Sequence, residues 1–136
     1  MAELYAEGGN YRIELEHRAA YCRVWTRRDV DSETGAGYAR DKIQHFEALA
    51  RGPADSMILD LIDAPPVAGP KTQGAIGEML GAWESARRPI ALVAGNDKVQ
   101  ALQLKRLAAQ HAPRFCCVFV GLEAARDWMR QLGHGT

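Results

Sequence analysis

The sequence predicts an α/β fold: a mixed sheet of about five strands, an N-terminal antiparallel hairpin plus three parallel strands, with about four helices. Three observations support this prediction. Runs that alternate between apolar and polar residues are confined to the first third of the chain, as expected for strands with one wet face. Unbroken apolar runs, typical of strands buried on both faces, occur only later. Helical segments separate those later runs, which implies parallel strands with right-handed crossovers.

Length and composition indicate one domain. A chain of 136 residues can bury a core without disulfides or metal, and we expect residues 1–136 to form one domain with its core at about residues 11–132. Its 17 basic and 17 acidic side chains leave no net field to attract nucleic acid. Its first residues show neither a basic n-region nor an apolar h-region, and no run approaches the about 18 apolar residues that cross a bilayer, so we expect neither a signal segment nor a membrane span. We therefore predict a cytoplasmic protein that is not membrane-embedded and binds no nucleic acid.

Two alternating runs, residues 11–16 and 21–27, predict the antiparallel hairpin. In the second run, Tyr21 and Trp25 lie on the same face as two arginines. We interpret this aromatic pair as cover for helix packing, and a partly exposed contact patch is the alternative. The first helix is predicted to begin at the capping side chains of residues 29–32 and to end at about Arg51, before Gly52 and Pro53.

The central strand is predicted at residues 56–63, a nearly unbroken apolar run with a turn signal on each side. A second helix follows the loop of residues 64–72 and carries Gly74, Gly77 and Gly81. Each glycine costs up to about 1 kcal/mol relative to alanine in a helix interior. Their spacing therefore indicates a helix pressed closely against a neighbour, with the sheet favoured over a partner backbone.

Two further strand and helix units complete the predicted fold. Residues 89–95 form a buried strand, and Asn96 or Asp97 caps the third helix. Residues 115–120 form the last strand, and the fourth helix runs to about Leu132, before a frayed tail.

The cysteines and histidines do not indicate a metal site. Cys116 and Cys117 are adjacent in a predicted strand, so their thiols point to opposite faces and neither share a metal nor form a disulfide. The four histidines show no ligand spacing with each other or with a cysteine. We predict that the cysteines are small core residues, and that the protein has no metal and no cofactor.

Function is expected at the carboxyl end of the central strand, because ligands of open α/β sheets meet the loops that leave the carboxyl ends of parallel strands. We predict a rim that binds a partner or a ligand there. Its residues are Asp63, Pro65, Pro66, Gly69, Lys71, Thr72, Asn96 and Lys98. Pro70 fits the first turn of the second helix, where its missing N–H costs little.

The sequence offers little for catalysis. Asp60 and Asp63 are three residues apart in a strand, so we expect their side chains on opposite faces and no shared site. The stretch from Gly69 to Thr72 lacks the spacing and the glycines of a P-loop. Neither a nucleophile elbow nor a paired serine and histidine is visible, so we predict that the protein is not an enzyme.

The order of elements resembles the STAS domain of bacterial anti-sigma-factor antagonists and of the cytoplasmic tails of sulfate transporters. Three stretches resemble strands of that family: residues 57–61, 89–95 and 118–125. The resemblance covers about residues 11–132. It implies a regulatory or scaffolding domain that binds a protein partner, and it leaves a homodimer open.

One departure from the family concerns its phosphorylated serine. STAS antagonists carry it in an Asp-Ser-Ser-Gly run where this chain reads Val-Ala-Gly-Pro-Lys at residues 67–71. Thr72 is the nearest hydroxyl and hence the candidate phospho-acceptor, and we expect constitutive rather than switched partner binding. The alternative function is a carrier of a small ligand, a lipid or a nucleotide. A carrier needs an apolar cavity of about 300 Å³ or more, whereas a docking module needs only a surface.

Overall fold

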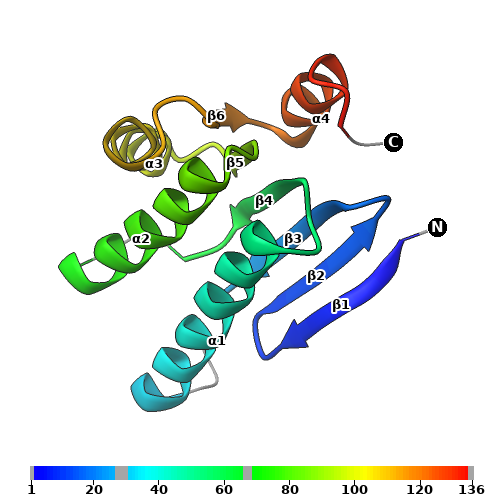
Figure 1. Ribbon diagram of the computed structural model, residues 1–136. Helices are drawn as coiled ribbons and strands as arrows, with labels where there is room; N and C mark the ends of the chain where they lie inside the picture. Colours follow the sequence, from blue (N-terminus) through cyan, green and yellow to red (C-terminus); the bar gives the residue numbers. More distant parts are fainter. Residues whose placement is uncertain (1, 27–30, 66–68, 135–136) are drawn as a thin grey trace.

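The computed structural model describes residues 2–26, 31–65 and 69–134. Within these ranges it has the predicted α/β fold, with a six-stranded sheet in the order β1-β2-β3-β4-β5-β6 and four helices (Figure 1). The antiparallel part consists of β1 (Glu3–Gly8), β2 (Tyr11–Glu16) and β3 (Ala19–Trp25). The parallel part adds β4 (Ser56–Asp63), β5 (Ile90–Ala94) and β6 (Cys116–Val120).

Strand β1 is the difference from the predicted five strands. It pairs antiparallel with β2 and forms one edge of the sheet, so the N-terminal unit has three strands rather than a hairpin of two. The side chains of β1 are exposed or only partly buried, and Leu4 is 53% exposed. An edge strand with so little burial has a weak apolar pattern in its sequence, and its backbone pairing with β2 is what stabilises it.

The helices begin where capping groups or turn residues place them. Asp31 caps α1 (Ser32–Arg51) by accepting a hydrogen bond from the Thr34 N–H at 2.7 Å. Asp97, rather than Asn96, caps α3 (Lys98–His111) by accepting from the Val99 N–H at 2.9 Å. Helix α2 (Pro70–Ala86) starts with Pro70 in its first turn, as predicted, and α4 (Leu122–Gln131) ends the described fold.

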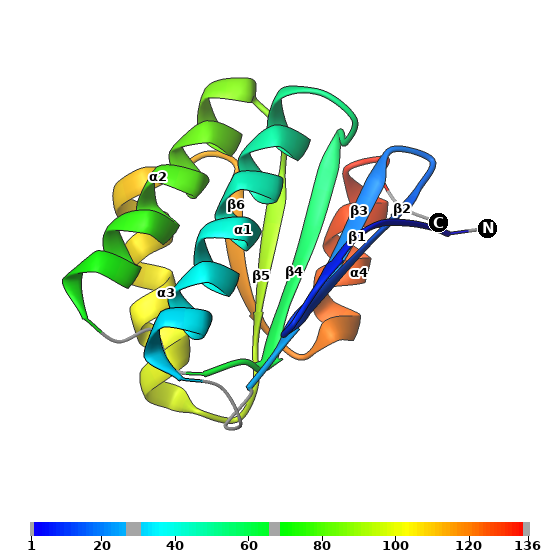
Figure 2. The same ribbon diagram turned by 90° about the horizontal axis from the view of Figure 1, so that it is seen from below.

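Helices α1, α2 and α3 cover one face of the sheet and α4 covers the other, as the edge-on view shows (Figure 2). Central strand β4 lies between β3 and β5, and Met57, Leu59 and Leu61 are at most 9% exposed, which confirms the predicted central strand. On the α4 side, Arg126 lies over the ring of Tyr21, with 5.7 Å between the guanidinium carbon and the ring centroid. Tyr21 therefore serves as cover for a helix.

The glycines of α2 pack differently from the prediction. A Cβ built on Gly77 would lie 2.6 Å from Nε2 of His111, so this glycine permits close packing against α3 rather than against the sheet. Cβ atoms built on Gly74 and Gly81 would meet nothing within 4 Å. Close packing thus explains one of the three glycines. No helix in the described ranges combines the length and the apolar character needed to cross a bilayer.

Candidate functional site

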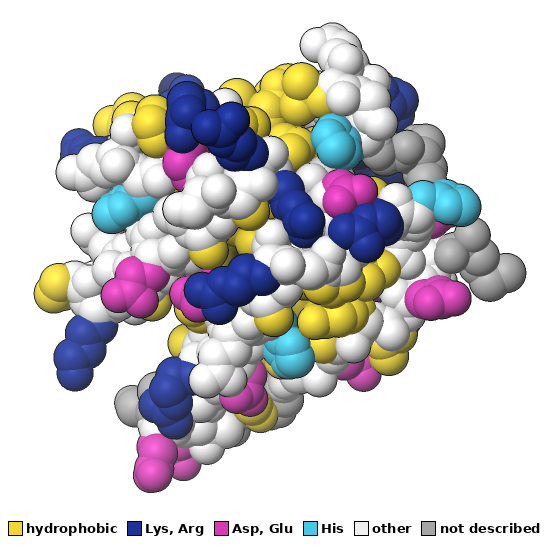
Figure 3. All heavy atoms as spheres, viewed as in Figure 1, with side chains coloured by type: hydrophobic (Ala, Val, Ile, Leu, Met, Phe, Trp, Pro, Cys, Tyr) yellow, Lys and Arg dark blue, Asp and Glu magenta, His cyan; other side chains and the backbone are white. Residues whose placement is uncertain are grey.

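An apolar cleft of about 640 Å³ lies between α1 and α2 above the sheet. Its floor consists of Val24, Leu59, Leu61 and Leu92 from three neighbouring strands. Its walls include Ile43 and Phe46 from α1, and Ile76 and Met79 from α2. Figure 3 shows the molecule hollowed between the N-terminal ends of these two helices.

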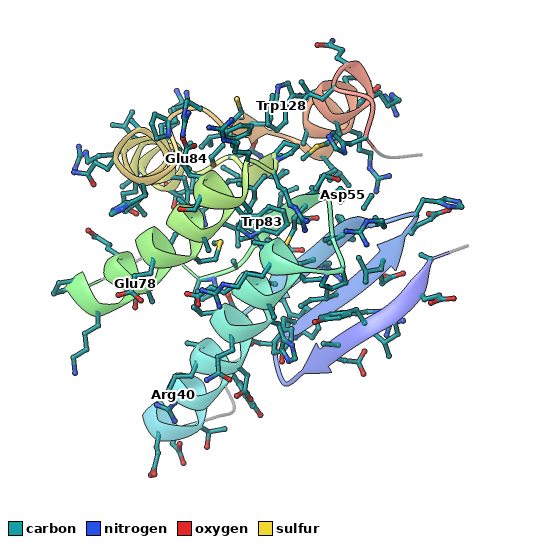
Figure 4. All side chains as sticks on the ribbon, viewed as in Figure 1. Arg40, Asp55, Glu78, Trp83, Glu84 and Trp128 are labelled. Carbon is teal, nitrogen blue, oxygen red and sulfur yellow. The ribbon has the colours of Figure 1, made fainter. Side chains whose placement is uncertain are left out.

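The cleft is held open by the way α1 and α2 pack. Trp83 of α2 is fully buried, and its indole N–H donates to the carbonyl oxygen of Phe46 on α1 at 3.2 Å. Trp83 lies between the C-terminal parts of the helices (Figure 4), so this hydrogen bond joins them there, while their N-terminal ends lie further apart in both ribbon views. The space left between those ends is the cleft.

Positive charge prevails among the residues that line the cleft. Among the described lining residues, three are cationic (Arg40, Lys42 and Lys71) and one is a carboxylate, Glu47, which pairs with Arg51 at 3.8 Å. Lys42 is half-buried, and this desolvation lowers the pKa of its ammonium group. Within the described part of the chain, the Lys42 side chain has neither an ion pair nor a hydrogen bond. An unpaired ammonium in these surroundings costs stability.

The start of α2 adds a polar edge to the mouth of the cleft. Gly69, the N-cap, has φ +83° and offers no side chain to accept from the first amides of the helix. The first turn contains no acidic residue, and Lys71 and Thr72 in that turn are exposed and line the cleft. The helix dipole therefore adds partial positive charge at this end, and no acidic side chain of the first turn offsets it.

Three of the predicted rim residues come together at the cleft: Pro65, Lys71 and Thr72. Gly69 lies next to them as the N-cap of α2. Asn96 and Lys98 are exposed at the start of α3 and do not line the cleft. Pro66 lies outside the described residues.

Asp63 lies on the far side of the sheet from the cleft, because a register shift occurs where β3 and β4 end. Asp60 pairs with Arg23 in register, but the next paired residues are Trp25 and Asp63, so β4 has one extra residue there. A carboxylate oxygen of Asp63 lies 2.9 Å from the Arg23 guanidinium, and Asp60 accepts a hydrogen bond from the Tyr21 hydroxyl at 2.6 Å. Tyr21 and Arg23 share one face of β3, so the prediction that the two aspartates point to opposite faces is wrong.

Sequence reasoning missed the contribution of α1 to the site. Lys42 is three residues after Ala39 and four before Phe46, which places it on the apolar side of its helix. A lysine within an apolar stripe is the signal that could have identified it. Gln100 also lines the cleft, and it is 4% exposed with its amide donating to the Leu61 carbonyl oxygen at 3.4 Å.

Two of the three cysteines, Cys22 and Cys116, lie in the core as predicted, and Cys117 does not belong to it. Cys22 and Cys116 are buried, which raises the pKa of each thiol to about 12, and Cys117 is partly buried. Within the described residues, no three side chains of histidine, cysteine, aspartate or glutamate come close enough together to hold a metal ion.

Comparison with known proteins yields no match to a family model, a curated protein or a solved structure. The resemblance to the STAS domain therefore stays a prediction.

Proposed function

We propose that this protein binds a small, largely apolar ligand in the cleft between α1 and α2. The observation that carries the proposal is the cleft itself, whose volume of about 640 Å³ lies within the range of about 300–1,000 Å³ for small-molecule sites. Its lining is mostly aliphatic and aromatic, with a few polar groups at defined positions. Of the two functions predicted from the sequence, a carrier requires such a cavity and a docking module does not.

The proposal includes binding and no chemical conversion. Among the described residues, the charged groups that line the cleft are three cations and a carboxylate that already pairs with Arg51. Thr72 adds a hydroxyl group to the cleft lining, in the first turn of α2 next to Lys71. This set suits recognition of a ligand better than proton transfer or nucleophilic attack, which need a nucleophile held by a base.

A bulky side chain placed inside the cleft should block ligand binding. Ala75 lines the cleft from α2, so Ala75→Trp should occupy the space that a ligand needs. Ala124→Trp, at an exposed position of α4, is the matched control. Native mass spectrometry of protein isolated from its native cells should show a bound small molecule with the wild type and the control, but not with Ala75→Trp. Equal ligand occupancy in a folded Ala75→Trp protein, or no ligand on any of the three proteins, would contradict the proposal.

A protein-interaction role is the second candidate, and exposed apolar side chains at the carboxyl edge of the sheet favour it. Ile62, Val99 and Val120 are 41%, 67% and 59% exposed, at the end of β4, the start of α3 and the end of β6. If a regulatory partner docks there, Val99→Glu should abolish its binding while Ala124→Glu leaves it intact. Stoichiometric phosphate on Thr72 that changes partner affinity tenfold would show that docking is switched by phosphorylation rather than constitutive.

A further inference from the structure

The cleft combines an apolar body with positive charge, and this combination indicates the chemical class of its ligand. Building on the proposed function, we infer that the ligand is a single-chain alkyl carboxylate, with its chain between the apolar sides of α1 and α2 and its carboxylate paired with the ammonium group of Lys42. The apolar surface within reach of the chain comes from the partly buried side chains of Ile43 on α1 and Ile76 on α2. The strand residues Leu59 and Leu92 are at most 3% exposed and form the packed base of the cleft.

Lys42 is the anchor because of its position. It lies among the cleft-lining residues of α1 on the side that faces β3, near the fully buried Cys22 thiol. A charge that is partly removed from water interacts more strongly with a counter-ion than an exposed charge does. Arg40 and Lys71 are exposed, so their contributions should be smaller.

The surroundings of Lys42 favour an anion from outside the chain. Within the part of the chain that the structure describes, the charged residues that line the cleft with it are Arg40 and Glu47 on α1 and Lys71 on α2. Glu47 is engaged by Arg51 on its own helix, and the lining residues contributed by β3, β4, β5 and α3 are uncharged. The whole chain has a formal net charge of zero, so this surplus of positive charge is local to the cleft.

A carboxylate fits better than a group of higher charge. One half-buried ammonium balances one negative charge, whereas a phosphate monoester brings −1.5 to −2 charges at about pH 7 that must also be desolvated. Partial positive charge at the uncapped start of α2 adds to the attraction at the mouth of the cleft.

Isothermal titration calorimetry with decanoate, decan-1-ol and decylammonium tests the inference. These probes share one chain length and differ in charge. Wild-type protein should bind decanoate at least about tenfold more tightly than decan-1-ol, as one charge-assisted hydrogen bond implies, and decylammonium most weakly. Lys42→Met should remove the preference for decanoate, Lys42→Arg should keep most of it, and Lys71→Met should reduce it less than Lys42→Met does.

The control and the contradicting outcomes separate this inference from the proposed function. Lys105→Met, at an exposed position of α3 and outside the cleft lining, should bind all three probes as the wild type does. Equal affinity for decanoate and decan-1-ol, or an unchanged preference in Lys42→Met, would overturn the carboxylate inference while apolar binding stands. Tighter binding of decyl phosphate than of decanoate would also overturn it. Failure of every probe to bind would count against the proposed function itself.

Discussion

Lys42 carries a stability cost that the proposed site explains. Its half-buried ammonium has no partner within the described residues, so Lys42→Met should raise the free energy of unfolding at pH 7 by about 0.5–2 kcal/mol, the usual gain when a functional residue is replaced by one that fits its surroundings. Urea denaturation followed by circular dichroism measures this gain. Lys105→Met should change stability by less than about 0.5 kcal/mol. A loss of stability in Lys42→Met would show that the ammonium is better accommodated than the structure indicates.

The pH dependence of this effect has a definite sign. Burial lowers the pKa of Lys42 below its ordinary value of 10.5, so the folded protein releases this proton before the unfolded chain does. The unfolded state then binds more protons between the two pKa values, and stability rises with pH across that window. The difference in free energy of unfolding between wild type and Lys42→Met should therefore be largest near neutral pH and should vanish as the pH approaches 10.5.

Glu84 on α2 should make the stability of the fold depend on pH in the acid range (Figure 4). Burial raises the pKa of its carboxyl group, but hydrogen bonds from the Arg114 guanidinium at 2.6 Å and from the backbone N–H groups of Arg114 and Phe115, each at 3.1 Å, outweigh burial and lower it. A lowered pKa means that this stabilisation is full above the unfolded value of 4.5 and is lost as the pH falls through the folded value.

Glu84→Gln should therefore lower the free energy of unfolding at pH 7 by about 1 kcal/mol or more, since its hydrogen bonds involve a charged acceptor. The difference from wild type should shrink below the ordinary pKa of 4.5. Urea unfolding curves at several pH values test both statements, with Glu78→Gln, an exposed position on the same helix, as the control. A difference that grows as the pH falls would contradict the assignment.

Single residues show what sequence reasoning can and cannot reach at this scale. Lys71 and Thr72 were predicted at the site because they follow the central strand, and the chain order alone locates the carboxyl end of that strand. Asp63 was placed on the same argument, but one extra residue in β4 turns it to the other face. Such a register shift depends on how β3 pairs with β4, and the local sequence does not reveal it.

At the scale of elements, the glycines of α2 make a matched comparison. Gly74→Ala should raise the free energy of unfolding by up to about 1 kcal/mol, because alanine favours the helix and a Cβ meets nothing there. Gly77→Ala should raise the free energy of unfolding by less, because the His111 ring must move aside. Thermal denaturation measures both changes.

A double-mutant cycle isolates the contact between Gly77 and His111. In a His111→Ala background, Gly77→Ala should recover a gain similar to that of Gly74→Ala, because the obstructing ring is gone. Equal effects of Gly77→Ala in both backgrounds would show that His111 does not limit the packing of α2 against α3.

Elements with strong patterns were predicted closely, and the weakly patterned one was missed. Strand β4 was predicted with its observed bounds, because its apolar run lies between clear turn signals. Strand β1 was missed because an edge strand is stabilised by its partner, and Leu4 and Tyr5 do not make a convincing alternating run.

At the scale of the whole molecule, the cleft arises from the angle between two helices. Patterns in the sequence predicted that α1 and α2 cover the sheet, and the apolar stripe with Ile76 and Met79 was visible. That the two helices separate toward their N-terminal ends depends on the packing of Trp83 against Phe46, a contact between residues 37 positions apart. Non-local packing of this kind sets interhelical geometry, and the sequence pattern leaves it undetermined.

The central claim is that a ligand occupies this cleft, and methyl-resolved NMR spectroscopy during a titration with decanoate tests it most directly. The account predicts chemical-shift changes at the methyl groups of Ile43, Ile76 and Met79, which line the cleft. Ile58 and Met129 line a smaller cavity of about 270 Å³ on the α4 side of the sheet and should not respond. Changes confined to Ile58 and Met129, or no change at any of the five residues at saturating decanoate, would contradict the account.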